Sequence, residues 1–280
     1  MNFSEWLHFT YTPITLSGYK DWLVELGTLN DITLSNCRFR MNRENGSISN
    51  KDNKAYFDQF DTTEINRQDK EHFLHPFQVF DAFHEEGALP IAAAVDAYIY
   101  DSDGNKYLDA VGGLWCTNIG LGREEMAEAI ADQVRNMAYA SPFVDMTNIP
   151  AAQLAAKLAE LAPGNLNHVA LSCGGSTAID TAYRLIHFYQ NCRGKHDKKH
   201  IISRINSYHG TTYASMSIGG KPGDHPPEFE YIKDTIHHIS CPNFYRADGD
   251  ISEADFLAAK LDELEAKIKE VGPDKVAAFF

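Results

Sequence analysis

Between residues 168 and 280, short apolar runs alternate with helical patterns, and this alternation constrains the fold more than any other feature of the chain. The apolar runs are 168–172 (HVALS), 201–205 (IISRI) and 276–280 (VAAFF). Apolar residues recur at helical spacing from Ala178 to Tyr189 and from Phe256 to Val271. Strand and helix in alternation are typical of a layer of parallel strands, so we predict an α/β fold.

The part before residue 168 predicts a hairpin and two helices. Two β-rich stretches, 97–100 and 107–108, flank a turn at Asp103-Gly104. Apolar residues then recur at helical spacing from Met126 to Met137. A second helix is expected to open at Pro150 and to stop before Pro163-Gly164. By contrast, the polar stretch 41–70 is typical of a linker or arm.

Charge and cysteine content exclude several classes of protein. The chain has 25 Lys and Arg against 39 Asp and Glu, a formal net charge of −14, which disfavours nonspecific binding to nucleic acid or anionic membranes. No apolar run is long enough for a membrane span, and we expect no signal peptide. The five cysteines are scattered and odd in number, which argues against a disulfide scaffold or a structural zinc module. We therefore expect a cytoplasmic protein.

The turn Gly174-Gly175-Ser176 is the first candidate site. It follows an expected strand and precedes an expected helix, so its glycines would let the backbone approach an anion at the helix N-terminus. Ser176 would add a hydroxyl. It is neither a Walker loop nor a GxGxxG fingerprint. The alternative is a serine N-cap that binds nothing.

Other candidates are weaker by themselves. Tyr208-His209-Gly210 could place a ring over a planar ligand, or its tyrosine could cap the core. Trp115, in a glycine-spaced loop, could wall a pocket or lie in the core. Cys173 could be a nucleophile at a helix N-terminus, but nothing else supports this. We expect no metal site: His196/His200, Asp224-His225 and His237-His238 suggest solvated connections or surface loops.

In order, these signals resemble the class III (omega) aminotransferases from about His75 to Phe280. The resemblance rests on His75-Pro76-Phe77, DGNKYLDA, VGGLWCTNIGLG, Ser141-Pro142-Phe143, SCGGSTAIDTA, NSYHGTTYASMSIGGKP, HISCPNFYR and the terminal VAAFF. Each motif is weak alone, but the ordered series is specific.

The resemblance implies a role for each matched residue. Gly175 and Ser176, with Gly174 before them, match the phosphate-binding turn for pyridoxal 5′-phosphate (PLP). Tyr208 matches the aromatic residue that packs on the cofactor ring, and His209 and Gly210 complete its loop. The residues that match positions lining the substrate pocket are Phe77, Trp115 and Phe143, the last of these usually supplied by the second subunit of a dimer. Many members have a glutamate where this chain has Thr177.

The resemblance also implies the fold and the domains. We expect an incomplete fold type I PLP transferase, with an extension at 1–74, the first segment of the small domain at 75–112 and the first part of the large PLP-binding domain at 113–280. The reaction would move an amino group from an amine or omega-amino acid to an oxo-acid such as pyruvate, in a homodimer. The family's Schiff-base lysine and pyridinium aspartate lie further along than Phe280, so we expect a truncated chain with neither catalytic residue. The alternatives are a non-catalytic fragment or pseudo-enzyme, and another enzyme of this fold such as a decarboxylase or racemase.

Overall fold

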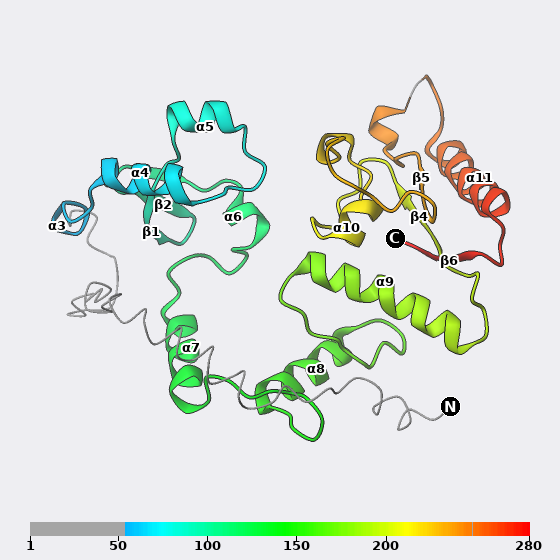
Figure 1. The fold of residues 1–280 in the computed structure, drawn as a ribbon, viewed down its shortest axis with the longest axis horizontal. Coiled ribbons are helices and arrows are strands. Elements are labelled where there is room, and N and C mark those ends of the chain that lie inside the picture. The colour runs from blue at the N-terminus through cyan, green and yellow to red at the C-terminus, as the bar shows by residue number, and fades with distance from the viewer. Residues whose placement is uncertain (1–53, 248) are drawn as a thin grey trace, which may run out of the picture. The chain divides into compact units, whose positions relative to one another are not determined.

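The computed structural model describes residues 54–247 and 249–280. The chain divides into two compact units, Met1–Tyr139 and Ala140–Phe280 (Figure 1). The domain boundaries expected from the resemblance, at 74/75 and 112/113, concern a complete transferase and stay predictions.

The first unit is built on an antiparallel meander. Its strands are β1 (Ile91–Val95), β2 (Tyr98–Asp101) and β3 (Lys106–Leu108), in the order β1-β2-β3. The predicted hairpin is thus confirmed as β2 and β3, while β1 was missed. The helices are α3 (Lys54–Phe57), α4 (Thr62–His72), α5 (Phe80–Glu86), the short α6 (Gly112–Trp115) and α7 (Glu124–Asn136). The last of these confirms the helix predicted from Met126.

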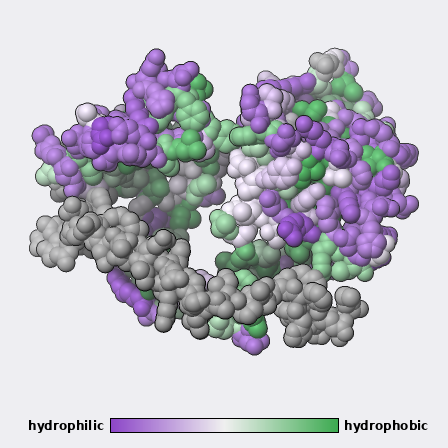
Figure 2. Space-filling view, in the orientation of Figure 1, coloured by the Kyte–Doolittle hydropathy of each residue, from purple (hydrophilic) through white to green (hydrophobic). Residues whose placement is uncertain are grey.

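The interpretation of 41–70 as a linker is wrong for its described part. Asp61 caps α4 by accepting a hydrogen bond from the Glu64 amide. The Thr62 hydroxyl, 2.7 Å from the Ser102 hydroxyl, ties the helix to the hairpin. The exposed face of α4 carries ion pairs, such as Arg67 with Glu64 at 2.7 Å, and the surface over it is hydrophilic (Figure 2). Polar composition therefore reflects a solvated helix face, which composition alone did not distinguish from a linker.

The second unit contains a parallel sheet. Its strands β4 (His200–Arg204), β5 (Ile236–Ile239) and β6 (Val276–Phe279) lie in the order β5-β4-β6, which confirms the predicted α/β layer. The helices include α8 (Ile149–Leu161), α9 (Gly175–Cys192), α10 (Tyr213–Ile218) and α11 (Glu253–Val271), with the short 3-10 turns η2 (Pro222–Asp224) and η3 (Phe244–Arg246). The helices predicted from Pro150, after Ser176 and around Phe256 are confirmed. The helix α10 and the strand β5 were missed.

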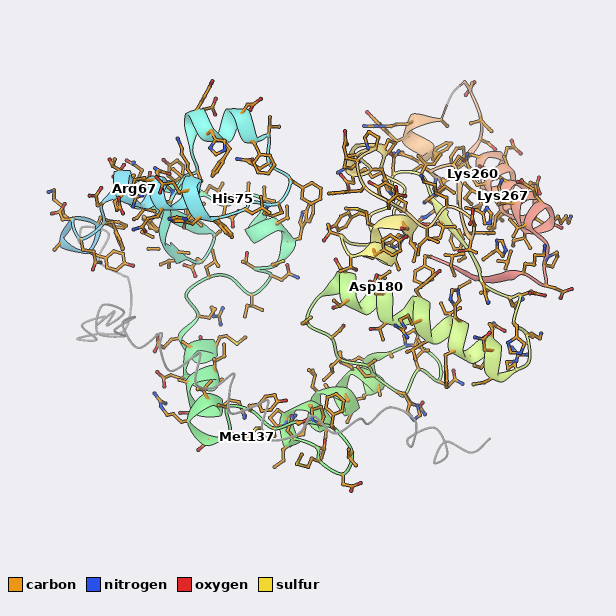
Figure 3. The ribbon with its side chains drawn as sticks, in the orientation of Figure 1. Arg67, His75, Met137, Asp180, Lys260 and Lys267 are labelled. Atoms are coloured by element: carbon orange, nitrogen blue, oxygen red, sulfur yellow. The ribbon has the colours of Figure 1, made fainter. Side chains whose placement is uncertain are left out.

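The core of this unit lies between the sheet and two helices. Ile201 of β4 and Ile236 of β5 are buried against Ile218 of α10, and Ile179 and Ile186 of α9 pack on the same cluster. Ser240 directly follows β5, and its amide donates to Glu263 of α11 at 2.7 Å. Lys260 of α11 donates to the Ser240 hydroxyl (Figure 3). The helix is therefore fixed to the carboxyl end of the strand.

The strand predicted at 168–172 is wrong. These residues take no regular secondary structure, and Leu171 is half exposed. A strand exists only where its N–H and C=O groups pair with a neighbour, and within the described residues this run has no such ladder partner. An apolar sequence alone does not show whether a partner is present.

The surface loop predicted for His237-His238 is also wrong, because both residues lie in β5. His238 Nε2 lies 2.9 Å from the Gly219 carbonyl oxygen, and His237 Nε2 lies 2.8 Å from His200 Nδ1. Asp224 and His225 are half-buried as well, and the His225 ring contacts two carbonyl oxygens. An imidazole can be satisfied inside the protein, so a histidine pair did not have to mark a surface.

Asp101 organises the hairpin turn of the first unit. Its buried carboxylate accepts hydrogen bonds from the Asp103 and Asn105 amides at 3.0 and 2.8 Å, and from the Asn105 side chain and the Tyr107 hydroxyl at 2.9 Å each. Burial alone would raise the pKa of Asp101, but the hydrogen bonds from Asn105, Tyr107 and Asp103 outweigh burial and lower it.

We predict that Asp101→Asn lowers the free energy of unfolding by about 1.5–3 kcal/mol, because an amide turns one acceptor atom into a donor that faces other donors. Urea unfolding followed by circular dichroism measures the change. Asp132→Asn is the matched control, since Asp132 lies exposed in an ion pair with Arg135, and it should shift the value by less than about 0.5 kcal/mol.

The same effect has a pH dependence. A carboxylate whose folded-state pKa is lowered contributes stability above its unfolded pKa of about 3.9, and loses it as the pH falls through the folded pKa. The difference between the wild-type protein and Asp101→Asn should therefore shrink below about pH 4. A difference that stays constant from neutral pH into this range would contradict the role of the charge.

Candidate functional site

The N-terminus of α9 is open and uncapped. Gly174 is the N-cap in an extended conformation, and no side chain within the described residues caps the helix. The first backbone bond of the helix runs from the Ala178 amide to the Gly174 carbonyl at 3.0 Å, so the preceding amides of Gly175, Ser176 and Thr177 have no intrahelical acceptor. A Cβ added at Gly174 or Gly175 would meet nothing within 4 Å. This helix end can therefore receive an anion against its backbone.

Ser176 joins this helix start to the loop after β4, residues 205–212. The Thr211 amide donates to Ser176 Oγ at 3.0 Å, and the Thr212 hydroxyl donates to the Ser176 carbonyl at 3.3 Å. Since Oγ is an acceptor in the first bond, its own proton is free to be donated to a ligand. The structure thus brings Ser176 together with the segment that the sequence singled out at Tyr208-His209-Gly210.

Gly210 is the point of closest approach between the two segments. Its φ is +139°, and a Cβ there would lie 2.5 Å from Ser176 Oγ, 2.6 Å from Ser215 Oγ and 2.7 Å from the backbone Cα of Ser176. Such distances exclude any other residue without movement of the backbone. The close packing of the loop on the start of α9 therefore explains why position 210 is a glycine.

A second contact at this junction was missed by the sequence analysis. Asp180, one turn into α9, accepts a hydrogen bond from the Ser215 amide at 2.8 Å (Figure 3). Ser215 also forms a capping box with Thr212 at the start of α10. The sequence held no clear signal for this contact, because Ser215 stands where the usual capping-box pattern has Glu or Gln and Asp180 lies 35 residues earlier in the chain.

His209 and Tyr208 differ sharply in environment. His209 Nε2 lies 3.3 Å from Ser203 Oγ, and the ring meets Phe280 edge-on with centroids 6.0 Å apart. Burial lowers the pKa of His209, and the nearby Arg204 and His238 lower it further, which keeps the ring neutral at pH 7. The Tyr208 side chain is exposed, so one face of its ring is available to a planar ligand.

The three expected pocket residues are all exposed, with relative exposures of 68% for Phe77, 77% for Trp115 and 74% for Phe143. The alternative of a core position for Trp115 is therefore wrong for this structure. Phe77 and Trp115 belong to the first unit and Phe143 to the second. Their roles as pocket walls stay predictions.

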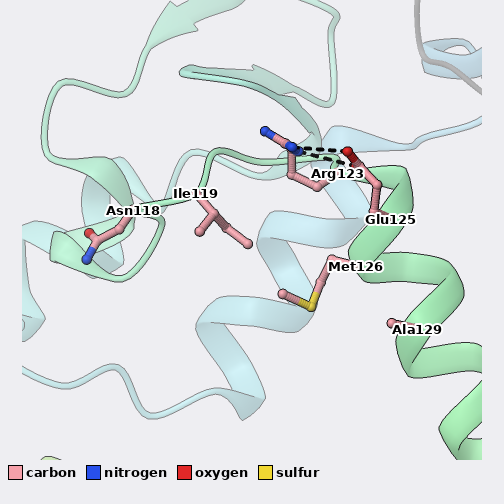
Figure 4. A pocket seen from close by; sticks show the side chains of 6 residues that line it. All are labelled: Asn118, Ile119, Arg123, Glu125, Met126 and Ala129. Carbon is pink, nitrogen blue, oxygen red and sulfur yellow. Dashed lines mark hydrogen bonds and ion pairs between the residues drawn. The ribbon is translucent and has the colours of Figure 1, made fainter. Parts of the chain in front are cut away.

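A separate hollow lies in the first unit beside the start of α7 (Figure 4). It contains an ion pair between Arg123 and Glu125, with 3.1 Å between the nitrogen and the oxygen. None of the candidate site residues named from the sequence lines it. In residues 54–247 and 249–280, no three His, Cys, Asp or Glu side chains converge as a metal site. No helix in this part of the chain combines the length and apolar character of a membrane span.

Comparison with known proteins gives consistent relatives. The chain is 39% identical over 218 residues to a putrescine–pyruvate aminotransferase of Pseudomonas aeruginosa, covering 78% of this chain and 48% of that protein. It is 38% identical over 187 residues to a diaminobutyrate–2-oxoglutarate transaminase of Halomonas elongata, covering 65% of this chain and 39% of that protein. The chain thus spans about half the length of the curated relatives it matches, or less.

Solved structures show the same fold. An (S)-enantioselective omega-transaminase of Thermomicrobium roseum matches with a TM-score of 0.76 and 32% identity, over 79% of this chain and 49% of that one. The omega transaminase of Pseudomonas jessenii, solved in complex with PMP, matches with a TM-score of 0.75 and 34% identity, over 77% of this chain and 48% of that one. These neighbours confirm the predicted fold type I architecture in partial form.

The class-III aminotransferase family matches residues 81–280, including the helix start, the 205–212 loop and the strand that ends at Phe279. The chain belongs to the class-III aminotransferases.

Proposed function

We propose that this chain forms the phosphate-binding part of a PLP-dependent transaminase, which transfers an amino group from an amine or omega-amino acid to an oxo-acid such as pyruvate. The observation that carries the proposal is the open N-terminus of α9, where uncapped amides and the free Ser176 proton meet. That combination suits a dianionic phosphate, because the amides, the hydroxyl and the helix dipole all favour negative charge.

The other residues fit the remainder of the cofactor. The exposed Tyr208 ring offers an apolar face to the pyridine ring, and the 205–212 loop that carries it is held on α9 through Ser176. His209, in the same loop, lies 3.3 Å from the Ser203 hydroxyl, and burial lowers the pKa of its ring. Thr177 donates its hydroxyl to the Gly174 carbonyl at 2.8 Å, so a glutamate at this position is not needed to form the turn. When bound, the cofactor supplies the electron sink for amino transfer.

Turnover by the complete gene product tests this proposal. With PLP added, we expect an amine and pyruvate to give alanine, with no turnover in its absence. Loss of CO₂ from the substrate or inversion of its α-carbon would favour the decarboxylase or racemase alternative. PLP binding without any turnover would favour a pseudo-enzyme. Reading the gene past the codon for Phe280 would show whether the family's lysine follows.

We predict that Ser176→Ala weakens PLP binding about 10- to 150-fold, the equivalent of losing one charge-assisted hydrogen bond of about 1.5–3 kcal/mol. Absorbance titration of the complete gene product with PLP measures this. Thr177→Ala is the matched control, because the Thr177 hydroxyl is bonded within its own turn, and it should change the affinity less than about threefold. Equal losses in both variants would contradict the assignment.

Gly175→Val separates binding from folding at the same turn. A Cβ at Gly175 meets nothing in the protein, so the free energy of unfolding should change little. The added methyl groups would nevertheless occupy the space through which a phosphate approaches the amides, so PLP affinity should fall further than in Ser176→Ala. Unchanged affinity in a folded Gly175→Val protein would exclude this turn as the phosphate site.

We also propose a cytoplasmic homodimer. Phe143 is exposed and precedes Val144, whose φ of +58° is rare for a β-branched residue. An exposed aromatic side chain on such a backbone suits a contact with a second subunit. The cysteines at 116, 173, 192 and 241 are free thiols, which supports a reducing compartment. Light scattering on the complete gene product should give twice the mass of one chain, and a fully active monomer would contradict a shared site.

A further inference from the structure

The residues Gly112–Trp115 (α6, Figure 1) form one turn of left-handed α-helix. Their φ angles are 60°, 58°, 57° and 64° in order, and ψ is 38° at Gly113 and 51° at Leu114. The turn is closed by hydrogen bonds from the Trp115 amide to the Val111 carbonyl at 3.0 Å and from the Cys116 amide to the Gly112 carbonyl at 2.9 Å. In L-residues this conformation crowds the Cβ against a carbonyl oxygen, so successive left-handed residues are rare.

The Asp109 carboxylate holds this turn. Its Oδ2 accepts a hydrogen bond from the Gly113 amide at 2.7 Å. The Asp109 amide in turn donates to the Ala97 carbonyl at 2.9 Å, which fixes Asp109 on the hairpin. At Gly113 a Cβ would lie 2.7 Å from Thr117 Cγ2. Two hydrogen bonds of Asp109, one from its amide and one to its carboxylate, therefore link the hairpin to the left-handed turn.

Core packing does not explain the strain. Leu114 is 67% exposed and Trp115 is 77% exposed, so the left-handed backbone is not a consequence of burying either side chain. Backbone strain that persists without such packing is typical of a functional position. The turn also determines the direction in which the indole of Trp115 leaves the chain.

We infer that Asp109 is a positioning residue for Trp115, and that through the left-handed turn it determines which size of amine the enzyme prefers. This inference rests on the proposed function, in which Trp115 walls the substrate pocket. Asp109 does not touch the substrate. It acts by fixing the Gly113 amide, and Trp115 follows two residues later.

The substrate preference of the complete gene product tests the inference. The ratio of kcat/KM for a bulky arylalkyl amine to that for a small aliphatic amine is compared between variants, with Trp115→Ala as the reference. Asp109→Ala should shift this ratio at least about tenfold in the direction of Trp115→Ala. Asp109→Asn keeps an acceptor oxygen and should shift it less than about threefold. A ratio that stays at the wild-type value in Asp109→Ala would overturn the inference.

A matched pair at Leu114 tests the backbone directly. Both Leu114→Gly and Leu114→Val remove the exposed leucine side chain, but glycine accepts a positive φ and a β-branched residue resists it. Leu114→Gly should therefore keep the wild-type ratio, and Leu114→Val should behave like Asp109→Ala. Equal shifts in both variants would mean that the leucine side chain matters rather than the turn, and would overturn the inference.

A spectroscopic readout separates this inference from the proposed function. Residues 1–280 contain Trp6, Trp22 and Trp115. Replacing every tryptophan of the complete gene product except Trp115 with Phe leaves Trp115 as the single indole. Its near-ultraviolet circular dichroism band should be lost in Asp109→Ala and Leu114→Val and kept in Asp109→Asn and Leu114→Gly. If the wild-type protein transfers no amino group, the proposed function fails while this band still reports the turn. A band that is equal in all four variants would overturn the role of Asp109.

Discussion

The pairing of β4 with β5 and β6 is the constraint on which the candidate site depends. Ile201 and Ile202 are fully buried in this strand, so its depth and register in the sheet are fixed by the apolar surface that they remove from water. The position of the 205–212 loop, which leaves the carboxyl end of β4, is therefore fixed. The N-terminus of α9 lies beside this loop because Ile179 and Ile186 of α9 pack on the same core. Carboxyl ends of parallel strands beside helix N-termini are where α/β folds bind anions.

The close contact at Gly210 holds the 205–212 loop against the start of α9, and together these two segments form the candidate site. Helix α9 and the 205–212 loop approach so closely that a single Cβ would collide with two serine hydroxyls. Ser176 can then satisfy the Thr211 amide and still present its proton outward. The helix N-terminus remains uncapped because its N-cap residue, Gly174, has no side chain that could accept from the first-turn amides, and this leaves the amides to a ligand.

Patterns with a strong local cause were predictable from the sequence. The helices around Met126, Leu158 and Leu261 follow from apolar residues at helical spacing, and the hairpin follows from Asp103-Gly104 between two β-rich runs. The glycine–serine turn at 174–176 was also found, because the order of strand, glycines and helix can be seen locally. What failed depended on partners distant in the sequence. Residues far away in the sequence decide whether 168–172 pairs as a strand and whether His237 and His238 find acceptors inside the protein. No local pattern identifies those residues.

Backbone handedness was equally hidden from the sequence. The sequence indicated only a glycine-spaced loop around Trp115, yet the left-handed conformation continues from Gly112 and Gly113 through Leu114 and Trp115, two residues that resist it. Phe77, with a φ of 55°, and Val144, next to Phe143, show the same feature. All three aromatic residues that the family resemblance assigns to the substrate pocket thus lie on, or next to, a backbone position that costs folding free energy. Each such residue costs about 1–3 kcal/mol, so the surrounding hydrogen bonds must hold it in place. The proposed phosphate turn rests on buried isoleucines and on the close contact at Gly210. The left-handed non-glycine residue of its loop is Asn206, a residue type that tolerates this conformation. The exposed Trp115 instead depends on the short hydrogen bond between the Gly113 amide and Asp109. Under the proposed function, substitution of Asp109 should therefore change substrate preference more readily than it changes cofactor binding.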